Sequence, residues 1–153
     1  MIGDTKEKDL KFGKVIEEKA KKVIEGATGR VLMRFADERG YDFYDRDSEE
    51  TFEIKYDKWL GKSGNFLIEL FSSIHPSNFE VGWYYRYHQN PPDYLVMVTM
   101  EKVFIFNYPD LNRYLEDNLT KFTIKGVSSN PDALVALTPF KEVEQFVSKE
   151  IEW

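Results

Sequence analysis

The sequence predicts a single α/β domain over residues 1–153, in which a mixed central β-sheet is flanked by α-helices. The chain is 153 residues long, with 42% apolar and 16% aromatic residues, which is enough to form one packed core. Apolar residues recur at helical spacing near both ends, and alternating or continuous apolar runs typical of strands fill much of the middle. No repeat or linker divides the sequence, and only residues 1–8 are expected to be flexible.

The first half begins with a predicted amphipathic helix over residues 9–25. Its apolar positions follow helical spacing and glycines come after it, at Phe12, Ile16, Ala20, Val23, Gly26 and Gly29. Residues 30–36 fit either a first strand or a short second helix, because their apolar periodicity is compatible with both. Residues 41–46 and 51–59 alternate polar with apolar and predict a β-hairpin, and "FLIELFSSI" predicts the next strand.

The second half opens with the aromatic segment "FEVGWYYRYHQNPPDY", which predicts irregular structure or a short helix because glycine and proline interrupt it. The remaining elements are predicted in chain order as two strands joined at Glu101-Lys102 ("YLVMVTM" and "KVFIFNY"), a helix starting at Pro109, a strand "FTIKGV", a further segment "ALVALTPF", and a closing helix "KEVEQFVSKEIEW".

Composition excludes several kinds of site. The absence of cysteine rules out disulfides, thiolate zinc sites and cysteine nucleophiles. A net charge of −6 argues against binding nucleic acid through a general positive field, although it also fits carboxylates gathered around a divalent metal, or simple solubility. The N-terminus does not read as a signal peptide and no apolar run approaches a membrane span, so a soluble, cytoplasmic protein is expected, in the host cytoplasm if it is phage or viral.

The stretch "TFEIKYD", residues 51–57, has unusual charge for an inner strand. Strand side chains alternate between faces, so Phe52, Ile54 and Tyr56 are expected to face a core, while Glu53, Lys55 and Asp57 share the opposite face. More sheet follows in the sequence, so this strand is predicted to be central rather than an edge, where charges would cost little.

A tight turn between Asp47 and Ser48 would place Asp42 opposite Glu53, with Cβ atoms roughly 4.5–5.5 Å apart. Two carboxylates that close repel unless a cation lies between them or one is protonated. Magnesium is commonly held by one or two such carboxylates, and Lys55 on the same face could orient water or stabilise phosphate charge. The two acids and the lysine therefore suggest a metal-dependent site for phosphodiester hydrolysis.

Two alternatives remain open on the residues alone. The x-E-x-K pattern is common on solvated strand faces and is a weak signal by itself. Asp37, Asp45 and Asp47 also compete with Asp42 for the first metal position. In a regular strand Asp45 lies on the other face from Asp42, which favours Asp42, but a β-bulge would reverse that preference.

The order "GYDFYDRDSEETFEIKYD", "SGNFLIEL", "GWYYRYHQNPPDYLVMV" and "KVFIFNY" resembles the PD-(D/E)XK nuclease superfamily, and more narrowly its small phage-type, virus-type or Holliday-junction-resolvase-like members. The resemblance implies a restriction-endonuclease-like fold and a DNA nuclease, endonuclease or exonuclease, that requires Mg²⁺ (or Mn²⁺). It makes Asp42 the first metal ligand, Glu53 the second and Lys55 the catalytic lysine. No proline precedes Asp42, which departs from the motif.

The same resemblance extends to supporting residues. The run "FGKVIEEKAKK" is similar to the family's first helix and makes Glu17 an assisting acid, and "GN…IE" brings in Asn65 near the DNA and Glu69 as a further acid. "EKVFIFNY" is either a dimer edge or core. The expected partners are therefore DNA and, in one alternative, a second copy of the chain, with no membrane.

Four further side chains are candidate nucleic-acid contacts. Lys58 and Lys62 follow the E-x-K strand, and Arg86 and His88 lie in the aromatic segment. Ordinary solvated lysines, and large aromatic residues that fill space against the sheet, are the simpler interpretations. The alternative function is a catalytically weak or inactive protein of the same fold that binds nucleic acid or protein.

Overall fold

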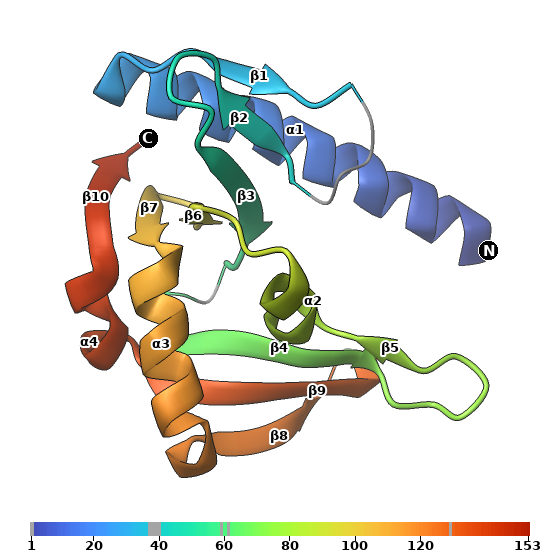
Figure 1. Ribbon diagram of the computed structural model, residues 1–153. Helices are drawn as coiled ribbons and strands as arrows, with labels where there is room; N and C mark the ends of the chain where they lie inside the picture. The colour runs from blue at the N-terminus through green and yellow to red at the C-terminus, as the bar shows by residue number, and fades with distance from the viewer. Residues whose placement is uncertain (1, 37–40, 59, 61, 129) are drawn as a thin grey trace.

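Two β-sheets and four helices make up the part of the chain that the computed structural model describes, which is residues 2–36, 41–58, 60, 62–128 and 130–153, with side chains from residue 11 onward (Figure 1). The larger sheet has the strand order β1-β2-β3-β6-β7-β10, and the smaller has the order β5-β4-β9-β8.

The strands of the larger sheet are β1 Leu32–Arg34, β2 Phe43–Asp45, β3 Thr51–Tyr56, β6 Tyr94–Val98, β7 Lys102–Asn107 and β10 Val147–Glu152. Those of the smaller sheet are β4 Asn65–Ser73, β5 Glu80–Val81, β8 Thr123–Val127 and β9 Asn130–Pro139. The helices are α1 Ile2–Thr28, α2 Trp83–Gln89, α3 Tyr108–Asn118 and α4 Phe140–Val143.

The larger sheet is mixed, because β3 and β6 run parallel while its other neighbouring strands are antiparallel. The predicted α/β class with a mixed sheet is therefore confirmed. The expectation of one central sheet is wrong, since β4 lies in a second, antiparallel sheet. Strand β3 already has β2 on one edge and β6 on the other, so β4, although next in sequence, has no edge of β3 to join.

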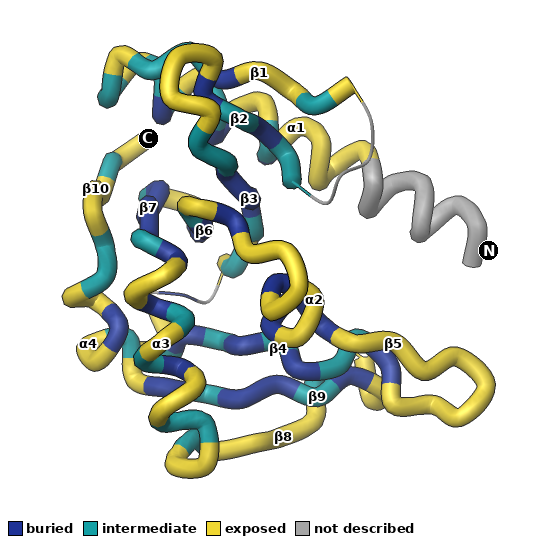
Figure 2. The backbone as a smooth tube through the Cα atoms, viewed as in Figure 1, coloured by how far each residue is buried: buried dark blue, intermediate teal, exposed yellow. Residues whose placement is uncertain are grey.

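One hydrophobic core lies between the two sheets. Phe66 and Ile68 of β4 pack in the same buried cluster as Leu95 of β6 and Phe106 of β7, together with residues of α2 and α3. Each fully buried side chain of this size contributes about 1.5–3 kcal/mol of transfer free energy. Figure 2 shows this interior as buried stretches of β4 and β9, whereas β8 and the β4–β5 connection are exposed.

A second core lies on the other face of the larger sheet, where α1 covers it. Ile16, Ala20 and Ile24 of α1 share a buried cluster with Phe52 and Ile54 of β3 and with residues of β6 and β7. Three of the predicted apolar positions of this face are buried or half-buried as expected, at Ile16, Ala20 and Val23, whereas Phe12 is exposed.

Helix α1 is longer than predicted, because it begins at Ile2 and so includes most of the segment expected to be flexible. It also ends three residues later than predicted, at Thr28, and of the two glycines only Gly29 stops it: Gly29 has φ 74° and its N–H donates to the carbonyl oxygen of Glu25 at 2.9 Å. Glycine adopts this left-handed conformation without steric cost, which stops the helix. The next segment, left open between strand and helix, forms strand β1.

The predicted closing helix is wrong. Helix α4 stops at Val143, and residues 147–152 form β10, which pairs antiparallel with β7. Val143, Val147 and Ile151 are spaced as on a helix, so the periodicity was misleading, and the otherwise unpaired edge of β7 determined the outcome.

The pairing of β10 also changes the interpretation of "EKVFIFNY", considered above as a dimer edge. This segment is the inner strand β7, covered on both edges by β6 and β10 of the same chain. No helix in the described part of the chain is long and apolar enough to cross a membrane.

Candidate active site

The β2–β3 hairpin has the register that the sequence predicts. Phe43 pairs with Phe52 and Tyr44 pairs with Thr51, so the next position outward places Asp42 opposite Glu53. The backbone N–H of Asp42 donates to the carbonyl oxygen of Phe52 at 3.2 Å. The Asp42 carboxylate also reaches across to β3, where its Oδ2 accepts a hydrogen bond from the backbone N–H of Ile54 at 2.7 Å.

Strand β3 is central, as predicted, and Glu53 is only 8% exposed. Phe52 and Ile54 enter the core under α1, so Glu53 and Lys55 lie on the opposite face; Tyr56, expected in the core, is 37% exposed. The Nζ atom of Lys55 lies 3.4 Å from Oε1 of Glu53, while the buried Oε2 of Glu53 has no hydrogen-bond partner. Apart from the nearby Tyr87 hydroxyl, no group among the described residues occupies this oxygen, so it is available to a ligand.

Helix α1 brings a third carboxyl group to this pair. Burial, a side-chain hydrogen bond to Asp42 and the charge of Asp42 raise the pKa of Glu17 to about 8, against the opposing charge of Arg34. Burial, followed by the charge of Asp42, raises the pKa of Glu53 to about 7, and Lys55 opposes this shift. The charge of Asp42 thus raises the pKa of both Glu17 and Glu53, and a shared proton or a bound cation would relieve this repulsion.

Two other side chains at this point were not predicted. Nη1 of Arg34 on β1 lies 3.6 Å from Oε2 of Glu17, and its guanidinium stacks 4.7 Å from the Phe43 ring centroid. No pattern in the sequence distinguishes this arginine, because its role depends on where α1 crosses the sheet.

The second unpredicted residue is Tyr87 on α2. Its buried hydroxyl approaches Glu53 without the geometry of a full hydrogen bond, and burial, followed by the charge and closeness of Glu53, raises its pKa. Lys55 Nζ lies 6.0 Å from its ring centroid. The buried side chains of α2, which are Trp83, Tyr84 and Tyr87, bear out the interpretation that this segment packs large residues against the sheet.

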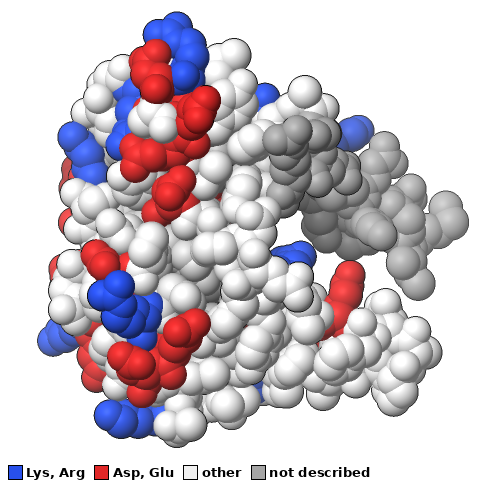
Figure 3. All heavy atoms as spheres, in the orientation of Figure 1, with Lys and Arg blue, Asp and Glu red and all other residues white. Residues whose placement is uncertain are grey.

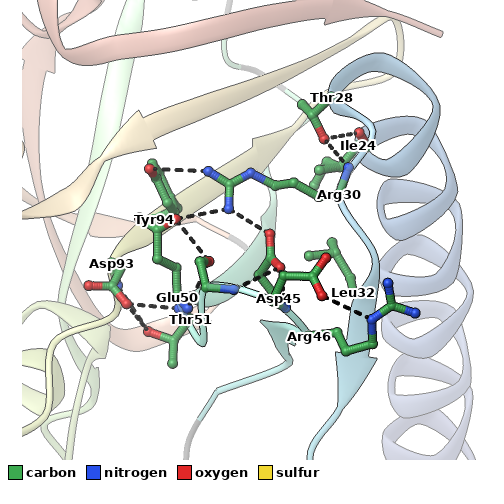
Figure 4. A network of polar contacts seen from close by, with 12 residues as sticks. Ile24, Thr28, Arg30, Leu32, Asp45, Arg46, Glu50, Thr51, Asp93 and Tyr94 are labelled. Atoms are coloured by element: carbon green, nitrogen blue, oxygen red, sulfur yellow. Dashed lines mark hydrogen bonds and ion pairs between the residues drawn. The ribbon is translucent and has the colours of Figure 1, made fainter.

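The other face of the hairpin is fixed by a separate polar network (Figure 4). Nη1 of Arg30 lies 2.8 Å from Oδ2 of Asp45 and 2.9 Å from Oε1 of Glu50. The backbone N–H of Thr51 donates to Oδ2 of Asp93 at 2.8 Å, which joins β3 to the start of β6. The hairpin is therefore held at its turn end, which keeps Asp42 and Glu53 in place.

This network also separates Asp42 from its competitors. Asp45 is 4% exposed, pairs with Arg30, and accepts N–H bonds from Asp47 and Ser48 that close the turn. Asp47 lies in the turn with a side chain that is 73% exposed. The β2–β3 pairing is regular, without the bulge that would have favoured Asp45. Asp37 lies outside the described residues.

The remaining predicted acid, Glu69, lies on β4 in the smaller sheet, as does Asn65 at the first position of that strand. Glu69 Oε1 lies 3.9 Å from Nη2 of Arg86 on α2. Backbone of Glu69 would lie 2.3 Å from a Cβ at Gly82, so α2 begins in close contact with this strand. Glu69 therefore anchors α2, and neither Glu69 nor Asn65 joins the group around Asp42 through any contact described above.

The predicted nucleic-acid contacts are dispersed. His88 Nε2 lies 3.2 Å from Oε1 of Glu116 on α3, and its Nδ1 lies 2.7 Å from the carbonyl oxygen of Tyr84. Lys58 and Lys62 are exposed and line a surface hollow of about 360 Å³ that also contains acidic side chains, namely Glu101, Glu144 and Glu150. Neither set forms a uniformly positive surface.

Mixed charge extends over the face seen in Figure 3. Acidic and basic side chains lie beside each other near the β2–β3 turn and over α3 and α4, with uncharged surface between them. This face therefore offers no broad positive field, which agrees with the net charge of −6.

Among the described residues, no group of three or more histidine, cysteine, aspartate or glutamate side chains is arranged to hold a metal ion. The pair formed by Asp42 and Glu53 is smaller than such a group, but one or two carboxylates with waters and phosphate are sufficient for magnesium.

In comparisons with known proteins, no protein-family model, no curated protein and no solved structure matches this chain. The functional argument therefore depends on the residues of the site and their geometry.

Proposed function

We propose that this protein is a metal-dependent nuclease that hydrolyses DNA phosphodiester bonds, with a restriction-endonuclease-like arrangement of its larger sheet. The observation that carries the proposal is the pairing of Asp42 with Glu53 across the β2–β3 hairpin, with Lys55 beside Glu53 on the same face. This set of two acids and a lysine is the one that the sequence predicts for Mg²⁺ or Mn²⁺ chemistry.

The acids fit a hard divalent cation. The donor set consists of carboxylate oxygens, which Mg²⁺ prefers, and Oε2 of Glu53 is buried without a partner. The raised pKa values of Glu17 and Glu53 reflect burial and mutual repulsion that a cation at Asp42 and Glu53 would relieve. When bound there, the cation would polarise the phosphate and lower the pKa of a coordinated water.

The chain's own groups would act around that site. Lys55 carries an ammonium group with three donors, and its pairing with Glu53 at 3.4 Å leaves capacity to donate to a phosphate oxygen. That donation would stabilise the negative charge that builds on the phosphate and position the attacking water. Glu17, held against Asp42, would support the position of the first ligand.

The experiment is a cleavage assay on plasmid, single-stranded, flapped and four-way DNA, with Mg²⁺ against EDTA. Cleavage is expected with Mg²⁺ and is expected to disappear in Lys55→Ala and in Glu53→Ala. Lys125→Ala, which changes an exposed lysine on β8 in the other sheet, is the matched control and should cleave like the wild type. Cleavage that persists in both site variants, or its absence under every metal tried, would overturn the proposal.

The second candidate is a binding module on the same fold. It is favoured by the absence, among the described residues, of a group of three or more metal-ligating side chains. Tight DNA or protein binding without cleavage under any metal would support the module instead.

A further inference from the structure

A hollow of about 610 Å³ opens on the hairpin beside the candidate active site. Aromatic side chains form much of its wall, from the segment after β1, from the residue before Asp42 and from β2. The polar residues come from the β2–β3 turn, from β3 and from the end of α2. The lining residues that matter are Phe35, Tyr41, Tyr44, Glu49, Thr51 and Asn90.

The hollow continues the same row of side chains as the acids. Tyr44 of β2 is two residues after Asp42, which directly precedes that strand, and Thr51 is two residues along β3 from Glu53; Tyr44 and Thr51 are themselves a cross-strand pair. Alternate strand residues share a face, so Tyr44, Thr51 and Glu53 belong to one face of the hairpin, and Asp42 lies at the end of this row, directly before β2. Two residues of strand span about 6.8 Å, so the hollow begins one short step from the Asp42–Glu53 pair.

The rings are arranged to leave aromatic surface toward the hollow. Phe35 lies 4.9 Å from Tyr44 and 5.9 Å from Tyr41 between ring centroids, and both pairs are tilted rather than stacked face to face. All three residues are half-buried, so part of each side chain remains accessible. The Tyr41 hydroxyl donates to the carbonyl oxygen of Pro91 at 3.1 Å, which ties this wall to the segment after α2.

Polar groups at the rim have the chemistry of base recognition. Glu49 contributes a carboxylate, which can accept a hydrogen bond from the edge of a nucleobase. Thr51 is already engaged, since its Oγ1 exchanges hydrogen bonds with Asp93, and its role is to shape the floor. The face seen in Figure 3 has no broad positive field, so stacking is a better source of affinity here than attraction to phosphates.

We propose that this hollow binds an unpaired base of a DNA strand whose phosphate lies at Asp42 and Glu53. The inference rests on the proposed nuclease function and gives it a substrate class: single-stranded DNA, or DNA with an unpaired overhang or flap. A base within a duplex is stacked on its neighbours and enters such a hollow only after extrusion, which makes duplex DNA the poorer substrate.

The test uses fluorescence anisotropy of a labelled single-stranded DNA oligonucleotide in Mg²⁺, with Lys55→Ala protein so that the probe stays intact. Abasic sites are placed at successive positions of otherwise identical probes, which keeps length and phosphate number constant. An abasic site at the position that enters the hollow should weaken binding about 5- to 150-fold, the range for loss of one base–aromatic stack. This comparison needs no change in the hollow, so misfolding cannot imitate the result.

Variants at Tyr44 give the second measurement. Tyr44→Ala should weaken binding of the intact probe to the level of the abasic probe, while Tyr44→Phe, which keeps the ring, should bind as the parent protein does. Equal affinity for intact and abasic probes at every position would overturn the inference.

The two proposals fail in different ways. Magnesium-dependent cleavage without any dependence on the base would remove the hollow's role and leave the nuclease function intact. Base-dependent binding without cleavage in the wild-type protein would support the hollow as a base site and contradict the nuclease function.

Discussion

The two faces of the β2–β3 hairpin hold buried carboxylates in opposite ways. On the face toward the end of α1, burial alone would raise the pKa of Asp45, but N–H groups of Asp47 and Ser48 and the Arg30 guanidinium together hold that pKa below its usual value. On the other face, burial and the charge of Asp42 raise the pKa of Glu53 to about 7, and at the edge of the hairpin burial and Asp42 raise the pKa of Glu17 of α1 to about 8. Asp45 is thus paired with N–H donors and a guanidinium group, whereas the acids around Asp42 repel one another.

The difference separates stability from function. A carboxylate with a lowered pKa stabilises the fold above its unfolded pKa, and this contribution is lost as the pH falls through the folded value. A carboxyl group with a raised pKa destabilises the fold increasingly as the pH rises from its unfolded value to its folded one. Asp45 therefore stabilises the hairpin. Ionised Glu53 and Glu17 destabilise the fold, and only a bound cation or protonation removes this destabilisation.

The largest expected effect is on activity and concerns Asp42. Asp42→Asn keeps the side-chain shape and an oxygen able to accept the Ile54 N–H, yet removes the charge of the first ligand. DNA cleavage is expected to fall by at least about 100-fold, because even changes to groups behind a metal ligand cost about 10- to 100-fold. The matched change Asp47→Asn, at an exposed turn position, should leave cleavage rates unchanged. Equal cleavage rates in Asp42→Asn and Asp47→Asn would contradict the assignment of Asp42 as a metal ligand.

The next effect is on stability and concerns Asp45. Asp45→Asn leaves the Arg30 guanidinium, already half-buried, with Glu50 alone and weakens the bonds that close the turn. Breaking a buried pair in this way should lower the free energy of unfolding by about 3 kcal/mol. Thermal denaturation should show a Tm lower by about 6–12 °C. A Tm within experimental error of the wild type would show that this face does not hold the hairpin.

The opposite sign is expected for Glu53→Gln. With a folded pKa of about 7 against an ordinary value of 4.5, the ionised group destabilises the metal-free protein at pH 8. Its removal should raise the free energy of unfolding there by about 1–3 kcal/mol and flatten the decline in stability between pH 5 and pH 8. Urea denaturation across that pH range checks this, and a variant less stable than the wild type at pH 8 would contradict it.

The smallest effect concerns Tyr87. Its buried hydroxyl has no hydrogen-bond partner, so Tyr87→Phe should leave stability unchanged or raise it by up to about 1 kcal/mol. Since the ring and its packing against Tyr108 remain, cleavage should fall by less than about tenfold. A stability loss above about 1 kcal/mol would mean that the hydroxyl does bond to Glu53 in solution.

The part of the site that lies within one hairpin was predictable. Alternation along residues 51–57 and the turn position set the pairing of Asp42 with Glu53, because strand geometry leaves few choices once the turn is placed. The fold class followed from the same periodicity.

The parts that depend on packing between distant elements were not predictable. Arg34 and Tyr87 reach the site only because of how α1 and α2 lie against the larger sheet, and nothing local to either residue encodes that. The second sheet and strand β10 were missed for a related reason: which strand edge remains open is decided by the whole topology, not by the segment that fills it.

The most direct test of the central claim is calorimetric titration of Mg²⁺ into the protein at pH 8, with three proteins compared. Wild type and Glu50→Gln, which alters the Arg30 network around Asp45, are predicted to bind the ion with the same affinity, while Glu53→Gln is predicted to lose that binding. Binding that is unchanged in Glu53→Gln, or lost in Glu50→Gln instead, would contradict the claim that Asp42 and Glu53, whose charges repel, form the cation site.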